Sequence, residues 1–204
     1  MKNKKLSRSI KITLLSTIAF LLMYIELAVP FFPEFLKIDI SDIPALMGAF
    51  ALGPVEGVII QLLKNILHGI FATKTGFVGE VANFVVGSVL VFVAGYIYRN
   101  NKSKRSAFVG LVAGTITMSV IAGILNLYVF IPLYQKILHI PIEAFVQMTA
   151  KVNPSVNSLG TLVLWSIVPF NLLKGVFISA LTMGMYKKVS PILHEEGIKK
   201  GQIA

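Results

Sequence analysis

The chain has 204 residues, of which 55% are hydrophobic and only 14% are charged, and its mean hydropathy is +0.79. Soluble domains carry about 25% charged residues, so this composition argues against a soluble globular protein and indicates an integral membrane protein. Cysteine is absent, which excludes disulfides, thiolate metal sites and cysteine nucleophiles.

The net charge is +10, and most of the basic residues stand next to apolar segments of the sequence. Basic residues gather before the first apolar run, in a short break near the middle, and at the end of the chain. They are Lys2, Lys4, Lys5, Arg8 and Lys11; Arg99, Lys102, Lys104 and Arg105; and Lys187, Lys188, Lys199 and Lys200. The positive-inside rule accounts for cations next to membrane spans, so we expect membrane lipid around the chain and no nucleic-acid partner.

The first apolar run, from Ile12 to Phe32, follows basic residues as the core of a signal peptide does. It is longer than the apolar core of a signal peptide, which has about 7–15 residues, and no A-x-A cleavage site follows it. We therefore predict a helix that is retained in the protein.

The apolar runs predict one transmembrane domain over residues 1–204, an all-α bundle of six helices. The expected spans are residues 10–30, 43–53, 54–71, 79–98, 107–133 and 159–186. The second span is short against the ~20 residues of a spanning helix, so we expect it to tilt, to lie above its neighbour or to break irregularly. Six crossings place the three basic clusters and both termini on the cytoplasmic side of the cell membrane.

Three connections then lie on the outer side, at residues 31–42, 72–78 and 134–157. The last contains the stretch HIPIEAFVQM, which predicts a short helix after a proline. Two interpretations of this helix stay open: a lid over a site, or a helix that lies on the outer surface.

The stretch PFNLLKG, from Pro169 to Gly175, puts polar residues inside an apolar span. At 1.5 Å per residue above Lys187, Lys174 lies ~20 Å and Asn171 ~24 Å from the inner face, on one side of a helix. Pro169 also leaves a backbone carbonyl without its helical hydrogen bond.

Polar residues of other segments reach the same level in the outer part of the membrane. Asn126 is ~30 Å above Ser106 at the inner end of its span, and Asn83 and Glu80 are ~24 and ~28 Å above Arg99, at the inner end of theirs. Asp39 and Asp42 belong to the first outer connection. Polar groups that converge at one depth indicate a binding pocket open to the outside.

Structural explanations of the same residues also stay open. Lys174 either binds a ligand, snorkels, or pairs with an acid such as Asp42 or Glu80, and Asn126 is a ligand contact or an interhelical hydrogen bond. Lys64 and Asn65 are structural or form the floor of the pocket. Tyr128 and its aromatic neighbours form an interfacial belt or stack on a flat ligand.

Motifs for catalysis are absent from the sequence. There is no G-x-x-x-x-G-K-[ST] phosphate loop, no H-E-x-x-H and no G-x-S-x-G, and the histidines show no metal-ligand spacing. We therefore expect neither an enzyme nor a metal site, and energy for transport would come from a partner or an ion gradient.

Four segments resemble the riboflavin-binding S components of energy-coupling factor (ECF) transporters. They are KIDISDIPALMGAFALGPVEGVIIQLLKNILH (37–68), TGFVGEVANFVVG (75–87), NLYVFIPLY (126–134) and PFNLLKG (169–175). The resemblance implies a six-helix membrane protein that captures riboflavin from outside, with FMN as a further candidate ligand, and needs no cofactor. It also implies a transmembrane coupling subunit and two cytoplasmic ATPase subunits as partners.

The resemblance also implies residue roles. Asn126, Asn171 and Lys174 would hydrogen-bond the vitamin, and the connection from Asp39 to Ile43, with Asp42, would form a gate over it. Glu80, Asn83 and Tyr128 complete the predicted ligand-binding set: Asn126, Asn171, Lys174, Asp39, Asp42, Ile43, Glu80, Asn83 and Tyr128.

The first helix of such proteins often docks on the coupling subunit through small residues. Here Ser9, Thr13 and Thr17 recur every fourth residue and would form that docking face. Two other functions remain as alternatives: an S component for another vitamin such as thiamine, and an autonomous secondary carrier.

Overall fold

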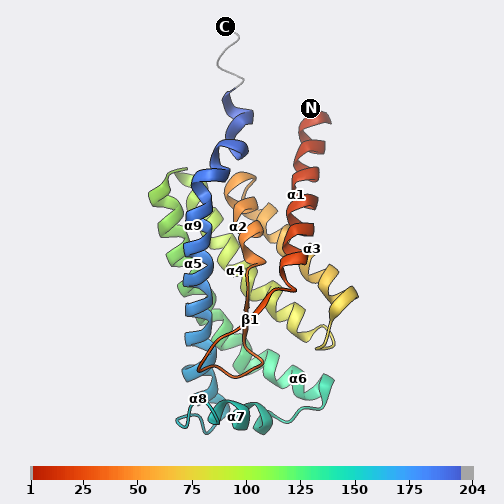
Figure 1. Ribbon diagram of the computed structural model, residues 1–204, viewed down its shortest axis with the longest axis vertical. Coiled ribbons are helices and arrows are strands. Elements are labelled where there is room, and N and C mark those ends of the chain that lie inside the picture. The colour runs from red at the N-terminus through yellow and green to blue at the C-terminus, as the bar shows by residue number, and fades with distance from the viewer. Residues whose placement is uncertain (1, 199–204) are drawn as a thin grey trace.

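A computed structural model describes residues 2–198 of the chain, with the side chains of residues 5–185; Lys199 and Lys200 of the last basic cluster lie outside the described residues. The described part is mostly helical, and its elements form an elongated bundle. Helix α1 (Lys2–Leu22) begins and α9 (Val168–Ile198) ends at the same end of the molecule, as Figure 1 shows.

The first helix is shorter at its C-terminal end than the expected span 10–30. It ends at Leu22, and β1 (Glu26–Ala28) pairs with β2 (Lys37–Asp39) in an antiparallel hairpin. Pro30 and Pro33 lie between the strands, and proline lacks the N–H that a helix needs. The prediction of an all-α bundle therefore missed one element, a β-hairpin that follows α1 and runs along the bundle.

Helix α2 (Asp42–Ala51) occupies the centre of the bundle and is only ten residues long. It contacts α1, α3 (Pro54–Ala72), α4 (Val78–Asn100) and α9. Ala45, Leu46 and Ala49 are at most 2% exposed. The short second span is therefore irregular: β2 runs to the middle of the bundle, and the ten-residue helix α2 continues from there.

Glycines let the neighbours of α2 approach closely. A Cβ at Gly57 of α3 would lie 2.7 Å from the Cβ of Ala49, and one at Gly95 of α4 would lie 2.9 Å from the same atom. Real side chains do not tolerate such distances, so the backbones meet at a separation that only glycine allows. Helix α2 is thereby held firmly on two sides.

The two longest apolar helices each contain a wide π-helical turn before a proline. Residues Lys104–Leu138 comprise α5 (Lys104–Leu125), η1 (Asn126–Phe130) and α6 (Ile131–Leu138). Residues Leu159–Ile198 comprise α8 (Leu159–Leu162), η2 (Val163–Ile167) and α9. Pro132 and Pro169 follow η1 and η2; because proline cannot bond the carbonyl four residues back, a wider turn relieves the clash without breaking the helix.

The end of the molecule opposite the termini is covered by short helices. Helix α7 (Ile142–Ala150) is present within the stretch that predicts it, and it lies with α6 and α8 at this end (Figure 1). Its Phe145 is buried in a second apolar cluster with Ile131, Leu162 and Ile167. Helices α3, α4, Lys104–Leu138 and Leu159–Met185 are each long and apolar enough to cross a membrane.

Candidate functional site

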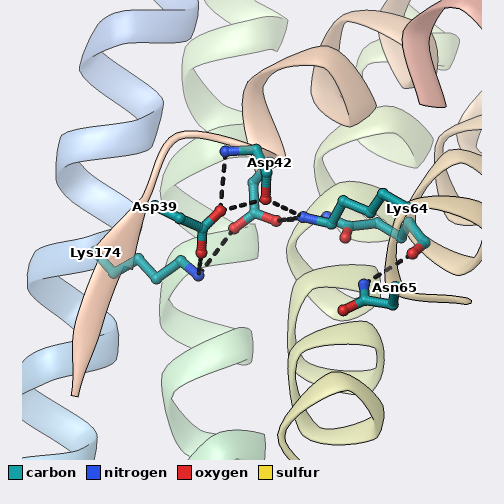
Figure 2. Close-up of polar contacts among 7 residues, drawn as sticks. Asp39, Asp42, Lys64, Asn65 and Lys174 are labelled. Atoms are coloured by element: carbon teal, nitrogen blue, oxygen red, sulfur yellow. Dashed lines mark hydrogen bonds and ion pairs between the residues drawn. The ribbon is translucent and has the colours of Figure 1, made fainter. Parts of the chain in front are cut away.

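A buried ion-pair cluster joins α9 to the end of β2 and the start of α2. The Nζ atom of Lys174 lies 3.1 Å from Oδ2 of Asp39 and 3.3 Å from Oδ2 of Asp42. Figure 2 shows the lysine reaching from α9 toward both carboxylates. The sequence offered Asp42 and Glu80 as partners of Lys174. Asp42 is a partner in the structure, and Asp39 is a second one that the sequence did not offer.

A second lysine completes the cluster from α3. Lys64 is fully buried, and its Nζ atom donates to Oγ of Ser41 and to Oδ1 of Asp42, both at 2.6 Å. Gln61 donates from Nε2 to the same carboxylate oxygen at 2.8 Å. The cluster therefore contains two ammonium groups and two carboxylates (Figure 2), and its formal charges cancel.

The local backbone positions Asp39 through a tight turn. Its Oδ1 accepts a hydrogen bond of 2.9 Å from the backbone N–H of Ser41 and another from the Ser41 hydroxyl. Burial opposes ionisation of Asp39, but the ammonium groups of Lys174 and Lys64 outweigh it and hold its pKa below the ordinary value. Asp39 is therefore a carboxylate at neutral pH, fixed at the inner end of the hairpin.

Two asparagines lie beside the π-helical turns. Asn126 is the first residue of η1, and Asn171 is two residues beyond Pro169. Each donates from Nδ2 to the carbonyl four residues back, at 2.8 Å. This bond fixes the side-chain orientation and leaves Oδ1 as an acceptor. Because η1 packs against η2, the turn that begins at Asn126 is a neighbour of the turn that ends four residues before Asn171.

Glu80 and Asn83 lie on α4. The Glu80 carboxylate contacts Nδ1 of His68 at 2.9 Å and accepts hydrogen bonds from the hydroxyls of Thr73 and Thr75. The structure thus gives Glu80 other partners than Lys174. Oδ1 of Asn83 is buried and has no hydrogen-bond partner among the described residues.

The remaining predicted residues differ in exposure. Ile43 is 5% exposed and follows Asp42 into the core. Tyr128 is 73% exposed, so the structure places its ring on the outside of the bundle rather than in the cluster. On α1, Ser9, Thr13 and Thr17 all lie on the exposed side, whereas Ser16 is buried.

Sequence reasoning left the role of Lys64 undecided. The signal that was available is a cation in the middle of an apolar span, which the membrane tolerates only with a partner. Its partner could not be predicted from the sequence, because Asp42 lies beside Lys64 only as a result of the short length of α2 and of the turn that precedes it.

The family model of the "ECF transporter, substrate-specific component" matches residues 7–186. This chain belongs to that family. As an S component it is a membrane protein whose family forms the substrate-binding part of a transporter, and an S component works with an energy-coupling module.

Relatives of this S component cover almost its whole length. "Riboflavin transporter RibU" of Staphylococcus aureus (strain TCH60) is 36% identical over 192 residues, which cover 94% of this chain and 93% of the relative. "Riboflavin transporter FmnP" of Bacillus subtilis (strain 168) is 32% identical over 198 residues, covering 96% and 97%.

A solved structure shares the fold of this S component. It is described as "Structure and mechanism of the S component of a bacterial ECF transporter", and it superposes with a TM-score of 0.75 at 34% sequence identity. The match covers 95% of this chain and 99% of that one.

Proposed function

We propose that this S component binds riboflavin on the outer side of the cell membrane and delivers it inward with an ATP-hydrolysing partner module. The observation that carries the proposal is the 36% identity, over 94% of the chain, to a riboflavin transporter of Staphylococcus aureus. The polar groups near the π-helical turns supply chemistry that suits this vitamin.

Riboflavin is uncharged and flat, with carbonyls and one N–H at the pyrimidine edge of its ring system. The Lys174 ammonium, which has three N–H donors, gives one to Asp39 and forms an ion pair with Asp42 at 3.3 Å, so it keeps a donor for a ligand carbonyl. Oδ1 of Asn126 or Asn171 accepts from the ring N–H. We assign Asn126, Asn171 and Lys174 to direct contact with the vitamin.

The electrostatics of the cluster favour an uncharged ligand over a cationic one. The cluster is neutral as a whole, and its most accessible cation, Lys174, is the group that faces the ligand in this proposal. A cationic vitamin such as thiamine would meet Lys174 with a like charge, which costs binding energy in a poorly solvated site. The riboflavin proposal is therefore preferred over an S component for thiamine.

The hairpin and α7 are proposed to cover the site. Phe32, between the strands, contacts Phe170 of α9 with ring centroids 5.5 Å apart. Phe35 meets Phe145 of α7 edge-on at 5.3 Å. The first contact ties the loop of the hairpin to α9 and the second ties it to α7. The proposed gate, which continues from this loop through Asp39, Asp42 and Ile43, is thereby held at its outer end.

Six membrane crossings with cytoplasmic termini complete the proposal. The end of the bundle that holds the start of α1 and the end of α9 also holds the connection between α4 and α5 (Figure 1). Lys102 belongs to this connection, and Lys104 and Arg105 begin α5. Ser9, Thr13 and Thr17 on the exposed side of α1 are assigned to docking on a transmembrane coupling subunit. Two cytoplasmic ATPase subunits supply the energy.

Uptake and binding together test this function. Purified protein titrated with riboflavin should quench the vitamin's fluorescence, and excess thiamine should not compete. In cells, uptake of labelled riboflavin should require co-expression of the coupling subunit and ATPases. Uptake by this chain alone, abolished by an uncoupler, would support an autonomous carrier instead; tight binding of thiamine would support the other vitamin.

A further inference from the structure

Lys64 is the one residue of the ion-pair cluster, among the described residues, whose side chain is 0% exposed. It lies in the middle of α3, and both of its hydrogen bonds reach the connection that leads into α2. A buried ammonium is tolerated only where its charge is paired and its donors are bonded. Ser41 and Asp42 meet that requirement, at 2.6 Å each.

Asp42 divides its two oxygens between the two lysines. Oδ1 accepts from Lys64 and from Gln61, whereas Oδ2 lies 3.3 Å from Lys174. The Lys174 side chain is 11% exposed. Lys64 is therefore enclosed with its acid, and Lys174 is the more accessible cation of the cluster. The two lysines approach the carboxylates from opposite sides (Figure 2).

Resting on the proposed function, we infer that Lys64 is a positioning residue that acts through Lys174. It is the fixed counter-charge of Asp42, and it lets the Lys174 ammonium turn toward a carbonyl of the vitamin without leaving that buried acid unpaired. Asp42 then keeps Lys64 and Gln61, and Asp39 keeps both hydrogen bonds from Ser41. Without Lys64, one ammonium must serve two carboxylates and stays with them.

The first test measures riboflavin binding by the variant K64M, in which a chain of similar length has no charge. We expect the riboflavin dissociation constant of K64M to be about thirtyfold higher than that of the wild type. The dissociation constant of the K64M/D42N double variant should be about tenfold lower than that of K64M, because residues in one charge network couple by such amounts. D42N alone, which leaves Lys64 unpaired, should bind more weakly than the K64M/D42N double variant. Lys74→Met, at an exposed position of the α3–α4 connection, is the matched control.

A second test separates action through Lys174 from a general structural role. In a K174A background, K64M should change the dissociation constant by less than about twofold, since the group through which it acts is gone. A full thirtyfold further loss in that background would overturn the inference. So would a K64M variant with a lower melting temperature and an unchanged riboflavin affinity.

The outcomes also separate this inference from the proposed function. If the wild-type protein binds no riboflavin, the proposed function fails. If the wild type binds and K174A weakens binding while K64M does not, only the role of Lys64 is overturned. Should K64M fail to fold, the comparison of D42N with the double variant decides, and tighter binding by D42N would contradict the inference.

Discussion

Asn171 and Lys174 lie one helical turn apart on α9, and their side chains are fixed by different neighbours. Asn171 is bonded to its own helix through the carbonyl of Ile167, whereas Lys174 reaches out to Asp39 on the hairpin. The amide therefore presents an oriented oxygen acceptor, and the ammonium an oriented donor. A ligand with both carbonyl and N–H groups on one edge can use the two together.

Truncating either side chain should weaken riboflavin binding. For Asn171→Ala and Lys174→Ala we expect a loss of about 1–3 kcal/mol each, because a buried polar group of the ligand is left without a partner. Fluorescence titration of the purified variants measures this loss. Lys136→Ala, at an exposed position of α6, should bind as the wild type does. Unchanged affinity in both site variants would mean that the site lies elsewhere.

For single residues, the sequence predicts the depth of Asn171 and Lys174 in the membrane and their place on one face of a helix, since both follow from counting along one helix. The partner of Lys174 could not be chosen from the sequence. Asp42 and Glu80 were both offered, and the structure pairs Lys174 with Asp42 and Asp39 while Glu80 bonds His68 and two threonines. That choice depends on how far the hairpin reaches into the bundle.

Helix α2 is the element that links the cluster to the rest of the bundle. It starts at Asp42 in the cluster and ends near Gly53, whose φ of 134° suits glycine in the turn to α3. Its short length is visible in the sequence as a ten-residue apolar run before Gly53-Pro54. The hairpin that precedes it was not predicted, because the apolar composition of residues 23–32 continues the pattern of the first helix.

Close packing around α2 predicts the effect of filling a glycine. Gly57→Ala should lower the free energy of unfolding by about 1–3 kcal/mol, because the new methyl group overlaps Ala49 and Val91. Thermal unfolding in detergent measures the change as a lower melting temperature. The control is Gly184→Ala on α9, where nothing lies within 4 Å of the new Cβ. There helix propensity favours alanine by up to about 1 kcal/mol, so equal melting temperatures for the two variants would contradict the packing account.

The exposed side of α1 predicts a separation of binding from transport. Thr17→Trp should leave riboflavin affinity unchanged and reduce uptake by the assembled transporter, because a large ring blocks close approach of a partner helix. Ile116→Trp on the exposed side of α5 is the control and should support normal uptake. Loss of vitamin binding in Thr17→Trp would show that this side of α1 belongs to internal packing instead.

At the scale of the whole molecule, the basic clusters and the short helices lie at opposite ends. The start of α1, the α4–α5 connection and the end of α9 share one end, and α6, α7 and α8 share the other (Figure 1). This arrangement of the two ends could be predicted from the sequence, because it follows from the order of the apolar runs and from the cations beside them. Neither depends on how the helices pack. The course of the chain through the two π-helical turns is a tertiary result that the sequence marks only by Pro132 and Pro169.

The proposed orientation predicts which ends react with a membrane-impermeant thiol reagent. The chain has no cysteine, so single cysteines can be introduced without background. Ser155→Cys should be labelled in intact cells, and Lys102→Cys only after the membrane is opened; both positions are exposed. Labelling in the opposite order would place the termini and the basic clusters outside.

A structure determined with riboflavin bound tests the central claim most directly. The account predicts the ring system against α9 beneath the hairpin, with its pyrimidine edge hydrogen-bonded to Lys174 and to an amide oxygen of Asn126 or Asn171. Lys64 should remain paired with Asp42. A vitamin found elsewhere, with Lys174 still bonded only to Asp39 and Asp42, would contradict the account.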